Sequence, residues 1–219
     1  MNADPLLQCW RAAWPQALAV WSKYTRLHDP LLCTSHREAL EAGLADSFAM
    51  IRLVDKSVVI DLTQVRTHGL EDFAPEILAH EIGHHVLAPA TLGDQFRLLA
   101  RVRAALPTLE KHVAMVANLY ADLLINDRLQ REGNLRMAEV FRRLAARAGA
   151  GNRVWELYMA IYEELWKLEP GSLGGLDDDA SRGDAWLGAR VIRVYARDWL
   201  NGAGRFASAP CVSTVLDHL

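Results

Sequence analysis

The segment with the clearest chemical potential is His80-Glu81-Ile82-Gly83-His84, which has the HExxH arrangement found in metal-dependent hydrolases. Residues four positions apart lie on the same face of a helix, so both imidazoles can reach one metal ion. Glu81 follows the first histidine, where its carboxylate can contact a water bound to that metal. We therefore predict a zinc site with His80 and His84 as ligands and Glu81 as the catalytic general base.

A catalytic zinc site usually has three protein ligands and leaves one position to water. One known route to the third ligand extends the motif with a glycine and then a third histidine, as metzincins do. Here Leu87 occupies the glycine position and Ala90 the histidine position, which excludes that route. The third ligand is therefore expected to be a carboxylate from a later helix.

An acidic residue stands in the apolar segment Leu109–Glu132, which is predicted to form a buried helix. Asn118, Asp122 and Asn126 recur every four residues and so form one narrow polar stripe. Burying a carboxylate is costly unless the group is paired or binds a metal. We predict that Asp122 is the third metal ligand, with Asn118 and Asn126 hydrogen bonding around it.

Other assignments on this helix stay open. Asp122 could instead pair with an arginine of the preceding predicted helix, where Arg97, Arg101 and Arg103 are available. In a thermolysin-like register, Asn118 would take the ligand position and Asp122 would support a histidine, although a neutral amide is a weak zinc ligand. Asp127 is a reserve ligand on another face of the helix.

The segments Leu78–His85 and Asn118–Asn126 together resemble the bacterial metallopeptidases associated with von Willebrand A proteins and MoxR-type AAA ATPases. In those proteins, an HExxH helix is followed by a helix of the form N-x-x-x-D-x-x-x-N. The resemblance covers Asp72–Arg131. It implies a zincin-like α+β core, bound zinc, and a MoxR-type ATPase or a von Willebrand A protein as partner.

Composition and charge exclude several other classes of protein. The chain has 219 residues, 51% of them hydrophobic, and a net charge of −3, so neither its charge nor any basic cluster indicates nucleic-acid binding. Three isolated cysteines without a CxxC argue against a disulfide framework and a zinc ribbon. No signal peptide or membrane-length apolar run is visible, so we expect a cytoplasmic protein without membrane contact.

The elements that must position these residues are predominantly helical, and we predict an α+β fold. The HExxH helix should begin after Asp72, as its N-cap, and end before Pro89. Two runs rich in Ile, Val and Leu, 48–54 and 57–62, predict one β-hairpin, and a loop should follow over 63–71. Periodicity predicts further helices over 6–27, 36–44, 92–106, 109–132, 134–148, 153–168 and 185–200.

For domain organisation, we predict a zincin-like metallopeptidase domain over 1–170. A segment rich in Gly, Asp and Ser over 171–184 is predicted to be a flexible linker or loop. A C-terminal helix and a tail without a clear period should follow over 185–219, and because the sequence ends abruptly we expect them to lead into a further region.

The predicted reaction is hydrolysis of a peptide bond by a metal-activated water, with Glu81 accepting the proton. The hairpin could align an extended protein or peptide substrate along its edge strand. The group that stabilises the oxyanion stays open among His112, Tyr120, Tyr158 and Tyr195. The alternative function is a catalytically dormant, zinc-bound scaffold or interaction module, which the presence of Glu81 disfavours.

Overall fold

The computed structural model describes residues 4–45, 47–147, 152–175 and 178–216. These residues form a predominantly helical α+β fold, as predicted, and contain one three-stranded sheet. They group into two compact units, the first made of residues 1–92 and 129–147 and the second of residues 93–128 and 148–219. The expected division of the chain around 171–184 stays a prediction.

The sheet belongs to the first unit and has the strand order β1-β3-β2. β2 (Ala49–Arg52) pairs antiparallel with β3 (Ser57–Asp61), which confirms the predicted hairpin. β1 (Leu31–Cys33) pairs parallel with β3. The sequence did not predict β1, because three residues are too few to show an alternating pattern.

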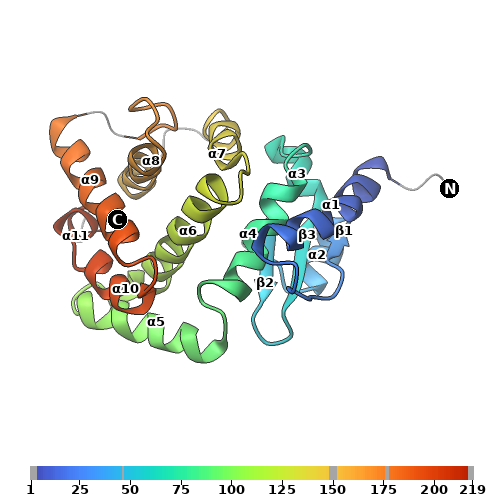
Figure 1. Cartoon of the computed structure of the whole chain (residues 1–219), viewed down its shortest axis with the longest axis horizontal. Helices are drawn as coiled ribbons and strands as arrows, with labels where there is room; N and C mark the ends of the chain where they lie inside the picture. Colours follow the sequence, from blue (N-terminus) through green and yellow to red (C-terminus); the bar gives the residue numbers. More distant parts are fainter. Residues whose placement is uncertain (1–3, 46, 148–151, 176–177, 217–219) are drawn as a thin grey trace. The chain divides into compact units, whose positions relative to one another are not determined.

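The HExxH segment lies on α4 (Ala74–Val86), which packs against α1 (Pro5–Trp21) and against β2 and β3 (Figure 1). The Trp21 indole N–H donates a hydrogen bond to the Ala79 carbonyl oxygen at 2.7 Å, one residue before the first motif histidine. An indole N–H can only donate, so a buried tryptophan needs such an acceptor. The N-terminal helix therefore supports the motif helix directly.

The N-terminus of α4 differs from the prediction. The N-cap residue is Phe73, not Asp72, and it makes no side-chain capping bond. Glu76 occupies the first turn, where a negative charge is favoured by the helix dipole. Asp72 contributes its backbone instead, because its carbonyl oxygen accepts a hydrogen bond from Arg136 Nη2 at 2.7 Å.

Glu76 and Arg136 form an ion pair within the first unit. Glu76 Oε1 accepts from Arg136 Nε at 3.0 Å and from the Arg136 backbone N–H at 3.3 Å. The Glu76 side chain is 3% exposed, whereas that of Arg136 is 48% exposed. Arg136 stands just before α7 (Met137–Ala145), so this pair ties the start of α4 to the start of α7.

The two halves of this pair should respond differently to substitution. Arg136→Met should lower the free energy of unfolding by about 3 kcal/mol, because it leaves a buried carboxylate without its partner. Glu76→Gln should cost only about 1 kcal/mol, because the amide oxygen still accepts and the half-exposed guanidinium can turn to water. Chemical denaturation of both variants measures the difference; equal losses would contradict this asymmetry.

Two short helices complete the first unit, α2 (His36–Glu41) and α3 (Leu62–His68). α3 occupies most of the segment predicted as a loop. The reason is local: Asp61 Oδ1 caps the helix by accepting from the backbone N–H groups of Thr63 and Gln64, and Gly69 ends it in the left-handed conformation with φ of 66°.

Asp61 is buried, with 1% of its surface exposed, and its second carboxylate oxygen lies 3.0 Å from His36 Nδ1. Burial alone would raise the pKa of this carboxyl, but the hydrogen bonds from Thr63, His36 and the backbone outweigh burial and hold the pKa below its ordinary value. A carboxyl whose pKa is lower in the folded than in the unfolded state stabilises the fold above the unfolded pKa. That stability is lost as the pH falls through the folded pKa.

We therefore expect acid to destabilise the protein in part through Asp61, below pH about 4. Asp61→Asn should lower the free energy of unfolding by about 2 kcal/mol at neutral pH, through the loss of charge-assisted hydrogen bonds. It should also make the loss of stability between pH about 4 and 2 shallower. Denaturation curves across this range test both effects, with Asp29→Asn at an exposed position as the control. A parallel pH profile for Asp61→Asn would contradict the assignment.

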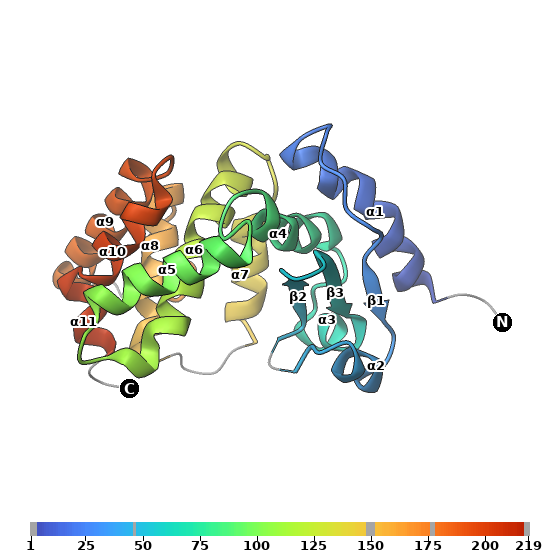
Figure 2. The ribbon, with the colours of Figure 1, turned by 90° about the horizontal axis from the view of Figure 1, so that it is seen from below.

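The second unit consists of helices, in which α9, α10 and α11 gather beside α8 (Figure 2). Its helices are α5 (Leu92–Ala105), the short 3₁₀ helix η1 (Glu110–His112), α6 (Val113–Arg131), α8 (Arg153–Trp166), α9 (Asp179–Val194), α10 (Trp199–Ala207) and α11 (Pro210–Leu216). The first residue of α5 and the last turn of α6 belong to the first unit. None of the helices in the described ranges combines the length and apolar character that a membrane span requires.

Three features of the C-terminal third differ from the prediction. α9 begins at Asp179, inside the segment expected to be a linker, because Asp178 caps it by accepting from the Ser181 backbone N–H at 3.0 Å. α10 and α11 occupy the part of the chain in which the sequence shows no clear period. Both are short, at nine and seven residues, so neither repeats its apolar pattern often enough to be recognised.

Candidate metal centre

The two motif histidines occupy one face of α4. Their rings lie with centroids 5.0 Å apart and planes at 89° to each other, in an edge-to-face arrangement. The residues on the opposite side of the helix, among them Leu78 and Ile82, are fully buried and anchor it in the first unit. His80 and His84 are only partly buried, so part of each residue stays accessible to solvent.

The imidazole of His84 is oriented by the turn that follows α4. His84 Nδ1 lies 3.1 Å from the Ala88 carbonyl oxygen. A carbonyl oxygen can only accept, so Nδ1 carries the hydrogen, and the neutral ring keeps its lone pair on Nε2. This arrangement is the one that fixes a metal-binding histidine in many sites, where the second ring nitrogen donates to a backbone carbonyl.

Asp122 lies on α6 and is partly buried. Asn118, one turn earlier on the same helix, donates from Nδ2 to Asp122 Oδ2 at 2.9 Å. This bond confirms the predicted contact between the amide and the carboxylate. Asn126, one turn later, donates from Nδ2 to the Tyr162 hydroxyl at 2.7 Å.

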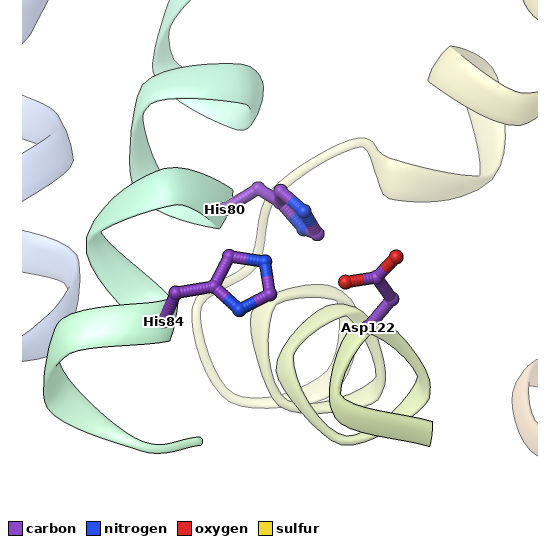
Figure 3. Close-up of side chains that lie close together, drawn as sticks. All are labelled: His80, His84 and Asp122. Carbon is purple, nitrogen blue, oxygen red and sulfur yellow. The ribbon is translucent and has the colours of Figure 1, made fainter. Parts of the chain in front are cut away.

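The structure brings together the three residues that the sequence selected as ligands. His80, His84 and Asp122 each offer one ligand atom, and these atoms all lie within 4.8 Å of one another. Figure 3 shows the two imidazoles of α4 and the carboxylate of α6 pointing toward one another. Asp127, the reserve candidate, is buried on α6 and lies outside this group.

The donor set suits a borderline cation such as zinc. Two imidazole nitrogens and one carboxylate oxygen are a common ligand set of catalytic zinc sites, which keep the fourth position open. The bonds from His84 to the Ala88 carbonyl and from Asn118 to Asp122 supply the outer-shell support that such ligands usually have. The residues present therefore fit a zinc ion.

Glu81 is 6% exposed, although it is an acidic side chain on a helix whose neighbours Ile82 and Ala79 are fully buried. A carboxylate in such surroundings is costly unless nearby groups stabilise it. Its position, directly after the first ligand, is the one expected of a general base in this motif.

The structure narrows the candidates for an oxyanion donor. The Tyr120 hydroxyl is bound to the Trp199 carbonyl oxygen at 2.8 Å, and Tyr120 is fully buried. Tyr158 is 4% exposed and hydrogen bonded to the Tyr162 hydroxyl at 2.7 Å, so it faces the protein interior. His112 ends η1, and Tyr195 is the C-cap residue of α9.

The bond between Asn126 and Tyr162 was not expected from the sequence. Tyr162 is fully buried on α8, and Tyr158 lies buried one turn earlier on the same helix. One indication of a hydrogen bond at this position was Asn126 itself, because it is a polar residue in a segment predicted to be buried, and a buried amide needs hydrogen-bond partners. Which residue on another helix would provide the partner could not be read from one sequence.

Comparison with known proteins adds no relative from which a function could be transferred. No protein-family model matches this chain, and neither a curated protein nor a solved structure matches it significantly.

Proposed function

We propose that this protein is a zinc-dependent metallopeptidase with a zincin-like core. The observation that carries the proposal is the convergence of His80, His84 and Asp122, with ligand atoms within 4.8 Å of one another, on a helix pair that also carries Glu81. A purely structural zinc site has no need of a carboxylate next to its first ligand. The intact Glu81 therefore favours an enzyme over a dormant scaffold.

In this proposal His80, His84 and Asp122 hold the ion. When bound, zinc supplies an activated water near neutral pH and polarises the substrate carbonyl. Glu81 would accept a proton from that water as the water oxygen bonds to the carbonyl carbon, and would pass it to the amine nitrogen as the carbon–nitrogen bond breaks. The hydrogen bond to Ala88 keeps His84 in the tautomer that leaves Nε2 for the metal.

The sheet offers a way to hold an extended substrate. β2 lies at one end of the strand order, so its outer edge pairs with no other strand of the described residues, and β2 packs against α4 in the same unit. A peptide that adds to this edge as a further strand would gain backbone hydrogen bonds regardless of its sequence. We propose this edge as the place where the substrate backbone is aligned.

The test is a digestion of a peptide library, analysed by mass spectrometry, together with metal analysis of the purified protein. Cleavage that stops after treatment with a chelator and returns with added zinc is the expected result. Protein that contains zinc but cleaves no peptide would favour the scaffold. Protein that binds no zinc, even after supplementation, would overturn the proposal.

A further inference from the structure

Two helices of the second unit, α6 and α8, run alongside each other in the same direction. Asn126 of α6 is hydrogen bonded to Tyr162 of α8, and earlier on both helices Leu119 and Leu157 line the same small apolar cavity. The two residues of the hydrogen bond and the two leucines at the cavity are separated by nearly the same offset along the chain. Between these two pairs, residues of α6 and α8 at this offset therefore lie level with each other, because both helices rise by the same distance per residue.

This register places Tyr158 level with Asp122. Each lies one turn before a partner of the bond just described, Tyr158 before Tyr162 and Asp122 before Asn126. Residues four apart share a helix face, so both side chains are directed to the same side as that bond. The hydroxyl of Tyr158 therefore stands opposite the carboxylate that we assign to the metal.

The two tyrosines and Asn126 form a continuous chain of hydrogen bonds. Asn126 Nδ2 donates to the Tyr162 oxygen at 2.7 Å, and the oxygens of Tyr162 and Tyr158 are 2.7 Å apart. An amide N–H can only donate, so the Tyr162 oxygen accepts from Asn126, and in one of the two possible directions of the next bond Tyr162 donates to Tyr158. The hydrogen of the Tyr158 hydroxyl is then directed to an acceptor beyond the chain. Both tyrosines are almost completely buried, so that acceptor must come from the protein.

The electrostatics of the two phenols agree with a nearby carboxylate. Burial raises the pKa of both tyrosines well above the ordinary value, and the negative charge of Asp122 contributes to the rise on each.

We propose that Tyr158 and Tyr162 are positioning residues for Asp122: the Tyr158 hydroxyl donates a hydrogen bond to the Asp122 carboxylate, and Tyr162, held by Asn126, fixes the Tyr158 hydroxyl in place. With Asn118 donating from the same helix, the carboxylate is held from two sides. A ligand held in this way loses less freedom when it binds the ion, and so the metal is bound more tightly. This inference rests on the proposed zinc site.

The test compares the zinc affinity of three isosteric variants, measured by competition with a chromophoric chelator. Tyr158→Phe and Tyr162→Phe should each weaken zinc binding by about 10- to 100-fold, the usual effect of losing an outer-shell hydrogen bond. Both substitutions keep the rings, including the stacking of Tyr162 on Trp166. Tyr120→Phe is the matched control, because it also removes a buried hydroxyl from a hydrogen bond, but one made to the Trp199 carbonyl.

A second readout separates positioning from general destabilisation. With cobalt in place of zinc, a carboxylate that has changed its orientation alters the visible absorption spectrum, whereas a site that is only less populated keeps its band positions. Changed bands in Tyr158→Phe but not in Tyr120→Phe support the proposal. If Tyr162→Phe fails to fold, Tyr158→Phe decides alone, because it removes only the last hydroxyl of the chain.

The negative results are distinguishable. A wild-type protein that binds zinc, with affinities of Tyr158→Phe and Tyr162→Phe within about twofold of the Tyr120→Phe control, would overturn the positioning role and leave the proposed function intact. A wild-type protein with no affinity for zinc would overturn the proposed function itself, and this inference with it.

Discussion

Glu81→Gln should retain its zinc and lose hydrolytic activity by roughly 100- to 10,000-fold, the usual contribution of a general base. Glutamine has nearly the same size and shape, so it can occupy this buried position without disturbing the helix. It cannot accept a proton, and so the water would have to be deprotonated by solvent. The measurement is kcat on a peptide identified in the library digestion, with zinc content determined on the same sample.

The matched control for this substitution is Glu41→Gln, which makes the same chemical change at an exposed position of α2. It should leave kcat unchanged. Full activity in Glu81→Gln would remove Glu81 from the mechanism, because no isosteric amide can replace a general base. Loss of zinc from Glu81→Gln would mean that this carboxylate serves the metal site structurally.

His84→Ala and Asp122→Ala should both lose zinc, with affinities lowered more than the roughly 100-fold expected for an outer-shell change. Each substitution removes one of the three proposed protein ligands. His85→Ala is the control, because it removes a neighbouring imidazole that does not belong to the ligand group. Metal content by mass spectrometry, after equal exposure to zinc, should be near one ion per chain for the wild type and His85→Ala.

The same variants should differ in thermal stability. A ligand present at about 100 times its dissociation constant stabilises the folded state by about 2.7 kcal/mol. Zinc should therefore raise the melting temperature of the wild type and of His85→Ala, but not that of His84→Ala or Asp122→Ala. If Asp122→Ala keeps its zinc while His84→Ala loses it, the third ligand must be reassigned to Asn118 or Asp127.

The parts of this site that could be predicted are those that depend on helical periodicity alone. The spacing of His80 and His84 places both on one face of any helix. Asp122 lies in an apolar segment, and a buried carboxylate there needs a charged partner or a metal ion. Neither inference needs knowledge of which elements pack together. That is why the sequence was sufficient to select all three members of the group that the structure brings together.

The parts that could not be predicted depend on short elements or on distant partners. β1 has three residues and pairs with a strand more than twenty residues away, so no local pattern reveals it. The signals for α3 were present, with Asp61 as a cap and Gly69 as a stop, but a seven-residue helix shows too few turns to establish a period. The partner of Asn126 lies 36 residues away on another helix, and only tertiary packing selects it.

The hydrogen bond from the Trp21 indole to the Ala79 carbonyl has a consequence for protein engineering. A shortened protein that began at β1 would lack α1 and would expose the apolar side of the motif helix to water. It would also remove the donor from a carbonyl group next to a metal ligand. A protein design that places α4 in another scaffold must therefore include α1 as well, because α1 covers the apolar side of α4 and supplies the Trp21 hydrogen bond.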